Sequence, residues 1–328
     1  MRLLALDGGG SKTVCLIADQ SGRVLGWGRG GPSNLSFASA EAAGAAIREA
    51  IVAACARAGL SSDGEPAIDV AVCGGPVRPP FMAETVAQAV QPPCYRFAAE
   101  AESCLASGGA NWGALVLAGT GSFEYARAKE GHEHRCDGWG SLFGDEGSAY
   151  DIARRALVAV ARAEDGRGPP TALREAVLAR FGVESFRAVS RRIYGENLPR
   201  DAIAGLSPLV SQAANADAVA REILHEAAMA LAHGALTCIR AVGLQEQRFP
   251  LVLCGGAFRA GQPMIAPLVE AVRSQAPGAE PVRPRFEPVY GALRLAFGCA
   301  TLDWDEAAER RFAESLNDPA LEALVVAG

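Results

Sequence analysis

The sequence predicts an α/β protein that is built from two similar halves. Each half opens with an apolar strand, a glycine turn, a second strand, a polar turn and a third strand, and helices follow. The repetition is one of structural pattern and not of strong sequence identity. At 328 residues, half of them hydrophobic, the chain is long enough for two domains with a large buried core.

The first half begins with a hairpin. Apolar runs are separated by glycines at 8–10 and by Ser21-Gly22, which is the spacing expected of paired strands joined by tight turns. An alanine-rich helix comes next, and Gly59 is placed to cap its C-terminus. The expected elements are strands over 2–7, 13–19, 23–28, 68–73 and 95–98, and helices over about 39–58 and from about 80.

The second half repeats this order and then becomes mostly helical. Prolines at 169–170 and within 277–288 predict surface loops. The expected elements are strands over 113–118, 123–128, 132–137 and 250–254, helices between about 145 and 243, and a final helix over about 290–300. These elements predict one domain over 1–108, with a returning helix at about 288–305, and a second, larger domain over 109–287.

Composition excludes several classes of partner. A formal net charge of -6 gives no electrostatic reason to expect nucleic acid or an anionic membrane surface. No apolar run reaches membrane-spanning length, and the N-terminus lacks the pattern of a signal peptide. Nine dispersed cysteines without a CxxC pair are typical of reduced thiols. We therefore expect a cytoplasmic protein that recognises its substrate through local groups.

Three glycine turns, each directly after an apolar strand, are candidate nucleotide-binding sites. The first two could hold phosphate, and a nucleotide base or ribose could lie against the bare backbone of the third. Backbone N–H groups bunched in such a turn form a concavity for anions, and glycine lets a phosphate approach the backbone. The first turn fits neither the Walker A nor the dinucleotide-binding spacing, and alone it is equally well explained as an ordinary hairpin turn. The residues concerned are Gly9, Gly10, Ser11, Lys12 and Thr13 in the first turn, Gly119, Thr120 and Gly121 in the second, and Gly255 and Gly256 in the third.

Two side chains at the first turn could bind ligands together with its backbone. Asp7 stands at the strand end beside the glycines, where a carboxylate could hold Mg²⁺ through water. Lys12 could neutralise a phosphate or remain solvated. Three such turns in this order across two similar halves predict a polyphosphate site more strongly than any one of them does.

Five segments carry a resemblance to a known family: DGGGSKT (7–13), LAGTGSF (117–123), DGWGSLFGDEGSAYDIARRAL (137–157), LCGGAF (253–258) and YGALRLAFG (290–298). Through them the chain resembles, over nearly its whole length, the N-acetylglucosamine kinase and BadF/BadG/BcrA/BcrD ATPase family. The resemblance implies two actin-like ATPase (ribonuclease H-like) domains with an interdomain cleft. It also implies transfer of the γ-phosphoryl group of ATP, with Mg²⁺, to a hydroxyl of a small amino sugar. N-acetylglucosamine is the first expectation, and glucosamine and N-acetylmuramic acid remain open.

The resemblance also implies roles for individual residues. The first turn would hold the β- and γ-phosphates and Mg²⁺, the second would hold phosphate, and the third would face adenosine. Without the resemblance, Asn34 is a turn residue and Asp145 is a helix N-cap or first-turn acid, a role that is compatible with sugar contact. The implied sugar-binding residues are Asn34, Glu100, Ser122, Gly138, Trp139 and Asp145.

Glu100 departs from the family pattern. Phosphoryl transfer needs a carboxylate that accepts the hydroxyl proton, and the family has an Asp, preceded by Asn or Thr, where this chain has Ala99-Glu100. A misplacement of roughly 1 Å can cost about a hundredfold in rate. Glu100 could serve as the base in a rearranged pocket, the substrate could differ, or the protein could be a non-catalytic sugar or nucleotide sensor. Ser141, where many relatives carry His, adds to this question.

A second class of function shares the superfamily. Its ATPase activators of reductases and dehydratases hold an iron–sulfur cluster with cysteines at a dimer interface. This chain shows no paired-cysteine signature and keeps the GDEGS segment, so we rank an amino-sugar kinase first. A homodimer is expected only by analogy. The helical region from about 165 to 245 offers no chemistry that the sequence reveals.

Overall fold

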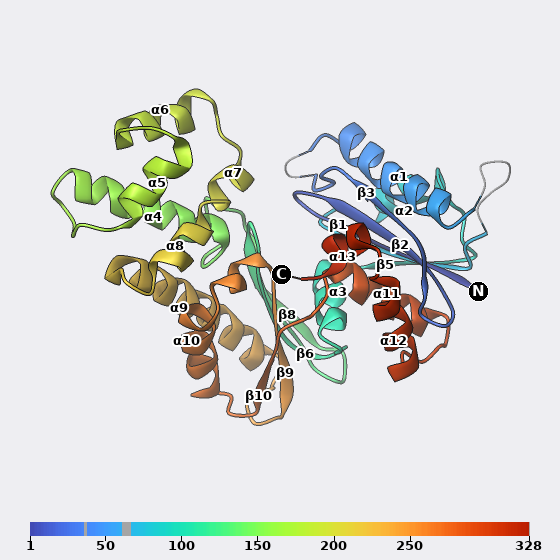
Figure 1. The fold of residues 1–328 in the computed structure, drawn as a ribbon. Coiled ribbons are helices and arrows are strands. Elements are labelled where there is room, and N and C mark those ends of the chain that lie inside the picture. The colour runs from blue at the N-terminus through green and yellow to red at the C-terminus, as the bar shows by residue number, and fades with distance from the viewer. Residues whose placement is uncertain (36–37, 61–66, 328) are drawn as a thin grey trace. The chain divides into compact units, whose positions relative to one another are not determined.

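The computed structural model describes residues 1–35, 38–60 and 67–327, and these form two compact units (Figure 1). Unit 1 comprises 1–111 and 284–327, and unit 2 comprises 112–283. The chain therefore leaves unit 1, builds unit 2 and returns. The returning part of unit 1 continues past the helix expected at 288–305, because two further helices pack against the same core.

Unit 1 is built on a five-stranded mixed sheet of order β3-β2-β1-β4-β5. The first three strands pair antiparallel, whereas β4 and β5 run parallel to β1. Parallel strands end at the same edge of a sheet, and here Asp7 lies opposite Gly74, which in turn lies opposite Ala98. The strands are β1 (Arg2–Gly8), β2 (Thr13–Asp19), β3 (Val24–Gly30), β4 (Val70–Gly74) and β5 (Cys94–Ala98).

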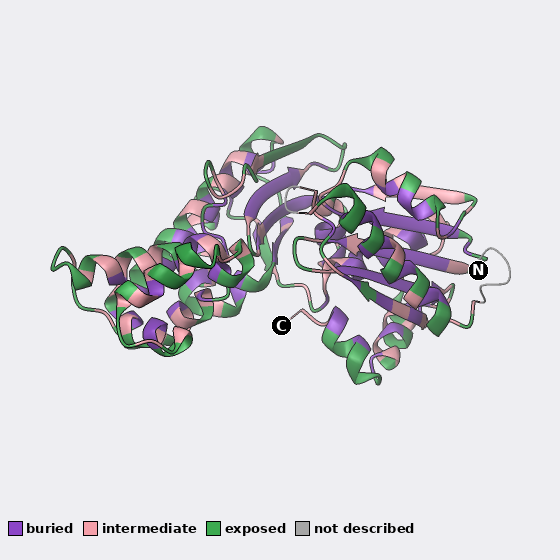
Figure 2. Cartoon of the chain, turned by 90° about the horizontal axis from the view of Figure 1, so that it is seen from above, coloured by how far each residue is buried: buried purple, intermediate pink, exposed green. Residues whose placement is uncertain are grey.

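Helices cover both faces of this sheet. Leu4, Leu6 and their neighbours pack against α1 (Ala40–Arg57) and α2 (Pro79–Ala87). Leu3, Ala5 and the other alternate residues pack against the returning helices, and the strands between the two layers are mostly buried (Figure 2). The returning helices are α11 (Pro288–Cys299), α12 (Glu306–Ser315) and α13 (Pro319–Val325).

One helix of unit 1, α3 (Glu100–Ser107), is pressed closely against α11. A Cβ added to Gly291 in α11 would lie 1.8 Å from the backbone oxygen of Ser103 in α3. Only glycine permits this approach. The contact fixes the position of α3 against α11, and hence the position of its first residue, Glu100.

Unit 2 repeats the sheet of unit 1. Its order is β10-β9-β6-β7-β8, again with three antiparallel strands followed by two parallel ones. The predicted α/β class and the structural repeat are both confirmed. The strands are β6 (Gly113–Ala118), β7 (Ser122–Arg127), β8 (Glu133–Asp137), β9 (Phe249–Cys254) and β10 (Ala279–Val282). The loop predicted over 277–288 was wrong at β10, a four-residue edge strand that contains Pro281 and pairs with β9.

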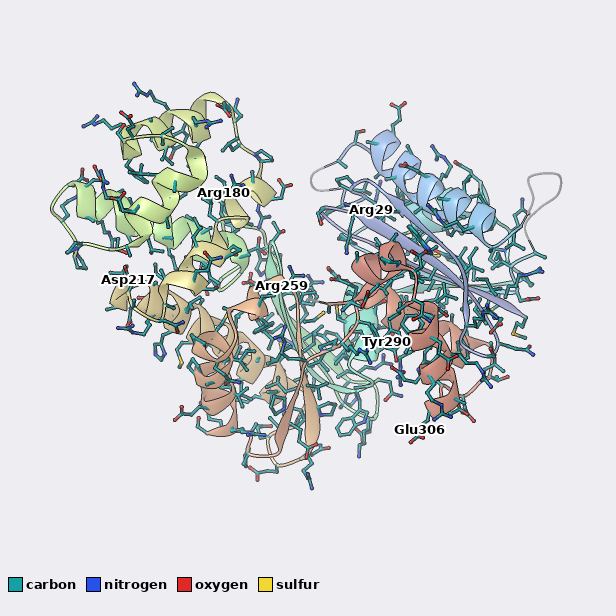
Figure 3. The ribbon with its side chains drawn as sticks, viewed as in Figure 1. Arg29, Arg180, Asp217, Arg259, Tyr290 and Glu306 are labelled. Carbon is teal, nitrogen blue, oxygen red and sulfur yellow. The ribbon has the colours of Figure 1, made fainter. Side chains whose placement is uncertain are left out.

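The helices of unit 2 pack on one face of its sheet around a continuous apolar core. Its longest helix, α9, begins after Asp217, which is labelled in Figure 3. The Asp217 carboxylate accepts hydrogen bonds from Ala220 N, Ala172 N and Thr171 Oγ1. The helices are α4 (Ala149–Glu164), α5 (Leu173–Phe181), α6 (Phe186–Gly195), α7 (Arg200–Ala204), α8 (Ser207–Ala213), α9 (Ala218–Ala241), the 3₁₀ helix η1 (Gly256–Ala260) and α10 (Gln262–Arg273). Over the residues that the structure describes, no helix has the length and apolar character needed to cross a bilayer.

The helix expected from about 145 starts later, at Ala149. Asp145 and Gly147 both adopt positive φ, at 59° and 73°, which is incompatible with an α-helix. Ser148 then caps α4 by accepting a hydrogen bond from Asp151 N at 3.1 Å. Asp145 therefore lies in a strained turn before the helix and not within it.

Candidate active site

The first glycine turn lies at the carboxyl edge of the unit 1 sheet. Gly9 N donates to Lys12 O at 2.9 Å, which closes the turn between β1 and β2. The buried Thr13 hydroxyl donates to Gly31 O at 2.8 Å and ties the turn to the end of β3. Gly10 and Ser11 are exposed at its tip.

Asn34 lies beside this turn. The backbone N–H groups of Ser33 and Asn34 both donate to Gly9 O, at 3.0 and 3.3 Å. A Cβ on Gly8 would come within 2.3 Å of the buried Ser33 Oγ, so the two segments meet with glycine as the only residue that fits. The structure thus brings a predicted sugar-binding residue against the predicted phosphate turn.

Glu100 opens α3 at the same sheet edge, directly after β5. Its neighbour Ala99 stands at the N-cap and has no side-chain acceptor to offer. Glu102 stabilises the start of the helix instead, because its Oε2 accepts a hydrogen bond from Ala99 N at 3.0 Å and its Oε1 accepts one from Arg96 Nη2 at 2.7 Å. The helix start is therefore held although the family's polar residue at position 99 is missing.

Three carboxylates meet at this edge. Burial raises the pKa of Asp7 well above its usual range, and the negative charges of Glu100 and Glu287 raise it further, while Lys12 lowers it. A partly buried carboxylate among like charges is stabilised by a cation. The residues present therefore fit the Mg²⁺ that the family implies, with Asp7 as the group that would hold it.

Glu287 was missed by the sequence reasoning. It stands at the N-cap of α11, and its Oε2 lies 3.8 Å from Lys12 Nζ. Lys12 Nζ also donates to Leu324 O of α13 at 3.3 Å. The signal that could have revealed Glu287 is an acid placed immediately before a proline that opens a helix next to the recognised YGALRLAFG segment.

The second and third glycine turns lie against each other in unit 2. Gly119 N donates to Gly121 O at 2.8 Å, which closes the second turn. Gly255 has a φ of 107°, and a Cβ there would lie 2.4 Å from Ala118 O. The predicted phosphate and adenosine segments of this unit are therefore neighbours at the ends of β6 and β9.

Asp145 lies over the second turn with its carboxylate buried. Its Oδ1 accepts from Ser122 N at 3.1 Å, and a Cβ on Gly121 would come within 2.8 Å of that oxygen. Asp137 holds the backbone of this segment, because its carboxylate accepts hydrogen bonds from Asp145 N at 2.9 Å and from Glu146 N at 3.1 Å. These bonds hold Asp145 in its left-handed conformation.

Arg200 also reaches this carboxylate, although no sequence motif indicated it. Its Nη2 donates to Asp145 Oδ2 at 2.5 Å and lies 3.4 Å from Thr120 O. Arg200 comes from the helical region in which no chemistry was predicted. A single arginine 55 positions away leaves no local pattern from which its partner could have been inferred.

The Gly138–Gly144 segment projects from unit 2. Trp139, Leu142 and Phe143 have 77%, 83% and 80% of their surfaces exposed. Gly138 and Gly140 have positive φ and let the segment turn sharply on either side of the indole. An exposed aromatic ring between glycines has the shape needed to lie against a pyranose, as predicted for Trp139.

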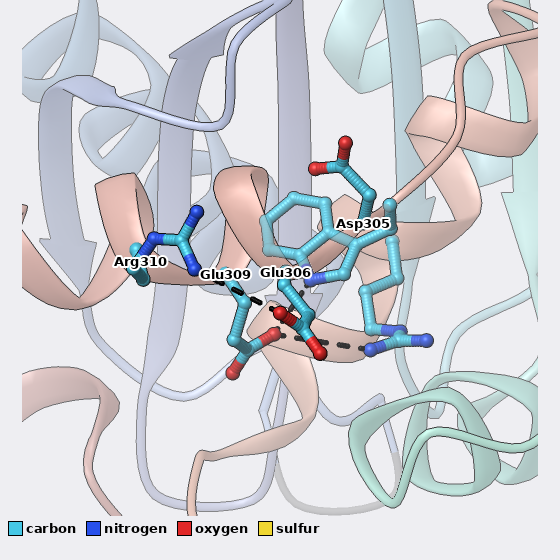
Figure 4. Close-up of a pocket in the computed structure, with 6 residues that line it drawn as sticks. Asp305, Glu306, Glu309 and Arg310 are labelled. Carbon is cyan, nitrogen blue, oxygen red and sulfur yellow. Dashed lines mark hydrogen bonds and ion pairs between the residues drawn. The ribbon is translucent and has the colours of Figure 1, made fainter.

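A pocket elsewhere in unit 1 is lined by Trp304 and five charged residues, four of which form ion pairs with one another (Figure 4). Arg294 lies 4.0 Å from Glu309, and Arg310 lies 3.8 Å from Glu306. Glu309 also accepts hydrogen bonds from Tyr290 Oη and, at 2.6 Å, from Trp304 Nε1. None of the six lining residues belongs to the predicted site, and their bonds join α11 to α12.

Comparison with known proteins gives consistent matches. A profile of the BadF/BadG/BcrA/BcrD ATPase family matches residues 4–296. The N-acetylmuramic acid/N-acetylglucosamine kinase of Clostridium acetobutylicum is 30% identical over 267 residues, which are 78% of this chain and 85% of that protein. The N-acetyl-D-glucosamine kinase of Dictyostelium discoideum is 29% identical over 311 residues, which are 89% and 97% of the two chains.

Solved structures agree with the fold. A candidate N-acetylglucosamine kinase from Chromobacterium violaceum superposes with a TM-score of 0.71 at 27% identity, over 90% of this chain and 98% of that one. A ROK family glucokinase from Streptomyces griseus gives a TM-score of 0.58 at 16% identity, over 91% and 100%, and so shares the fold. Because the family profile covers all three glycine turns, Glu100, Asp145 and most of α11, the chain belongs to the BadF/BadG/BcrA/BcrD ATPase family.

Proposed function

We propose that this protein is an ATP-dependent kinase that phosphorylates a hydroxyl of an amino sugar, with N-acetylglucosamine as the first acceptor to test. The observation that carries the proposal is the edge of the unit 1 sheet, where Glu100, Asn34 and the first glycine turn come together. A proton acceptor, a sugar-binding amide and a phosphate turn are the parts that phosphoryl transfer to an alcohol needs.

The residues of unit 1 have separate roles in catalysis, sugar binding and phosphate binding. Glu100 accepts the proton of the attacking hydroxyl, and Asn34 orients the sugar beside it. The backbone of Gly9 to Thr13 holds the β- and γ-phosphates, with Lys12 as a positive charge. Asp7 holds Mg²⁺ through water, and the bound ion would supply charge neutralisation for the phosphates.

The residues of unit 2 bind the rest of both ligands. The backbone N–H groups of Gly119 to Ser122 hold phosphate, and Gly255 and Gly256 offer bare backbone to adenosine. Asp145 accepts hydrogen bonds from sugar hydroxyls, while Gly138 lets Trp139 lie flat against the ring. Lone pairs remain on both Asp145 oxygens, since a carboxylate has about four acceptor positions.

Two further properties belong to the proposal. A cytoplasmic location suits an enzyme that consumes ATP. A homodimer follows only by analogy with relatives. The acceptor could instead be glucosamine or N-acetylmuramic acid, and the latter is in the name of the Clostridium acetobutylicum relative.

The test is ADP release with Mg²⁺-ATP against N-acetylglucosamine, glucosamine, N-acetylmannosamine, N-acetylmuramic acid and glucose. We expect stimulation by at least one amino sugar, and a loss of about 10²- to 10⁴-fold in kcat for Glu100→Gln, because a general base contributes about that much. Glu100→Asp should retain more activity than Glu100→Gln. Sugar binding without turnover in the wild type would contradict the kinase proposal and indicate a sensor.

A further inference from the structure

We propose that Arg200 is a positioning residue of the sugar site, which acts by holding the carboxylate of Asp145. The inference rests on the proposed function, because it gives Asp145 its sugar-binding role. Nothing in the sequence motifs points to Arg200, and the contact joins the helical region after α4 to the second glycine turn.

The position of Arg200 depends on how α7, the helix that it opens, is held. This five-residue helix is held against α4 by a small apolar cluster in which Ile203 and Leu206 pack on Ala153. Tyr150, from the first turn of α4, packs against the same cluster, and the Arg200 guanidinium carbon lies 5.1 Å from its ring centroid. Apolar packing and the ring therefore aim the guanidinium before any ligand arrives.

The guanidinium then completes a set of bonds around one carboxylate. Oδ1 of Asp145 accepts from Ser122 N at 3.1 Å, and Oδ2 accepts from Arg200 Nη2 at 2.5 Å. Asp145 is 5% exposed and adopts a φ of 59°, which is unfavourable for a residue other than glycine. With a donor on each oxygen, only the remaining lone pairs are available, and their directions are fixed.

The charges nearby explain why a basic partner is needed. Asp137 binds the backbone of the same turn, and Glu146 follows Asp145 directly, so the segment carries several acids. A buried carboxylate without a partner costs much more than a paired one. Loss of Arg200 would let the Asp145 side chain turn toward solvent, away from the place where a sugar hydroxyl must meet it.

The experiment compares Arg200→Gln, Arg200→Lys and Asp145→Asn in the full chain. Arg191→Gln is the matched control, because Arg191 is an exposed arginine of the same helical region. Sugar affinity is measured by calorimetry without nucleotide, KM for ATP and for sugar by turnover, and folding by thermal unfolding. The sugar used is the one that the acceptor panel identifies.

We expect Arg200→Gln to weaken sugar binding about 10- to 100-fold, which is the range for losing a hydrogen bond to a charged group. KM for ATP should stay within about twofold, Arg200→Lys should recover part of the loss, and Arg191→Gln should change nothing. The Asp145→Asn, Arg200→Gln double variant should bind sugar no more weakly than Asp145→Asn alone, because both changes remove one interaction.

Several outcomes would overturn the inference. Unchanged sugar affinity in Arg200→Gln excludes a positioning role, while losses that add in the double variant indicate a direct sugar contact by Arg200. Equal weakening of sugar and ATP with reduced thermal stability indicates a merely structural role. A wild-type protein that binds no sugar of the panel would overturn the proposed function as well, and this result is distinguishable from the others.

Discussion

Replacement of Glu124 by glutamine tests how the core of unit 2 tolerates a buried acid. Glu124 lies on β7, is 2% exposed, and faces α9, where a Cβ on Gly234 would come within 2.1 Å of its Oε2. Burial raises the pKa of this carboxyl to about 9, assisted by the charges of Asp137 and Glu146 and opposed by its own backbone N–H and by Arg135. The folded protein therefore keeps Glu124 protonated at neutral pH.

The sign of the effect follows from proton binding. The ordinary pKa of the group is 4.5, so between pH 4.5 and about 9 the folded state binds one proton more than the unfolded state. Stability at this position is greatest at low pH and falls as pH rises, by about 1.4 kcal/mol per unit. From pH 5.5 to 7.5 the wild type should lose roughly 3 kcal/mol of unfolding free energy through Glu124.

The assay is urea unfolding of the wild type and of Glu124→Gln at both pH values. Glutamine is neutral in both states, so the variant lacks this loss, and its stability relative to the wild type should rise by roughly 3 kcal/mol across the interval. Titrating groups that do not interact with Glu124 cancel in the difference. Glu130→Gln, in an exposed turn, is the control and should run parallel to the wild type. Parallel curves for Glu124→Gln itself would refute the reasoning.

Three other predictions concern contacts described above. Gly291→Ala forces a Cβ onto Ser103 O and should lower the unfolding free energy by at least about 1–3 kcal/mol in urea, whereas Gly298→Ala in the same helix meets no atom and should be neutral or stabilising. Lys12→Gln should raise KM for ATP severalfold while the melting temperature changes little, because the Lys12–Glu287 pair is about a third exposed; an unchanged KM would remove Lys12 from the phosphate site. Asp217→Ala should destabilise the protein by about 1–2 kcal/mol at pH 7. Burial raises the pKa of Asp217, but hydrogen bonds led by that from Ala220 N lower it overall. The loss of stability in Asp217→Ala should therefore shrink as pH falls below about 4. Urea titrations at pH 7 and pH 3 test this, and an equal loss at both pH values would show that the bonds do not favour the charged form.

The regular elements could be read from the sequence because their signals are local. Both hairpins have apolar runs of strand length separated by glycine turns, and the structure confirms the strands at 13–19 and 113–118 with unchanged bounds. β10 gave no such signal, since a short edge strand with a proline is stabilised by its neighbour β9 and not by its own pattern. The start of α4 was placed early because a left-handed aspartate cannot be distinguished by sequence from a first-turn acid.

The residues of the candidate site also fall into two groups, those that local sequence motifs reveal and those that only tertiary packing brings to the site. The glycine turns and Asp145 lie within contiguous motifs, and the structure shows which of them are neighbours within each unit. Glu287 and Arg200 act on these motifs from 275 and 55 positions away, counted from Lys12 and Asp145 respectively. Such pairs are created by tertiary packing of helices whose own sequences look like ordinary solvated faces. A single sequence contains no record of that packing.

The split composition of unit 1 has a consequence for how the chain is made. Its sheet is finished early in synthesis, yet the face formed by Leu3 and Ala5 is covered only by helices that follow residue 287. Near the end of the described chain, Val325 O accepts a hydrogen bond from Glu287 N at the start of α11, and Leu324 O accepts one from Lys12 Nζ in the first turn. Unit 2 is therefore synthesised whole while unit 1 still exposes apolar surface. A nascent chain stalled before α11 would be a target for chaperones and would lack a finished phosphate turn.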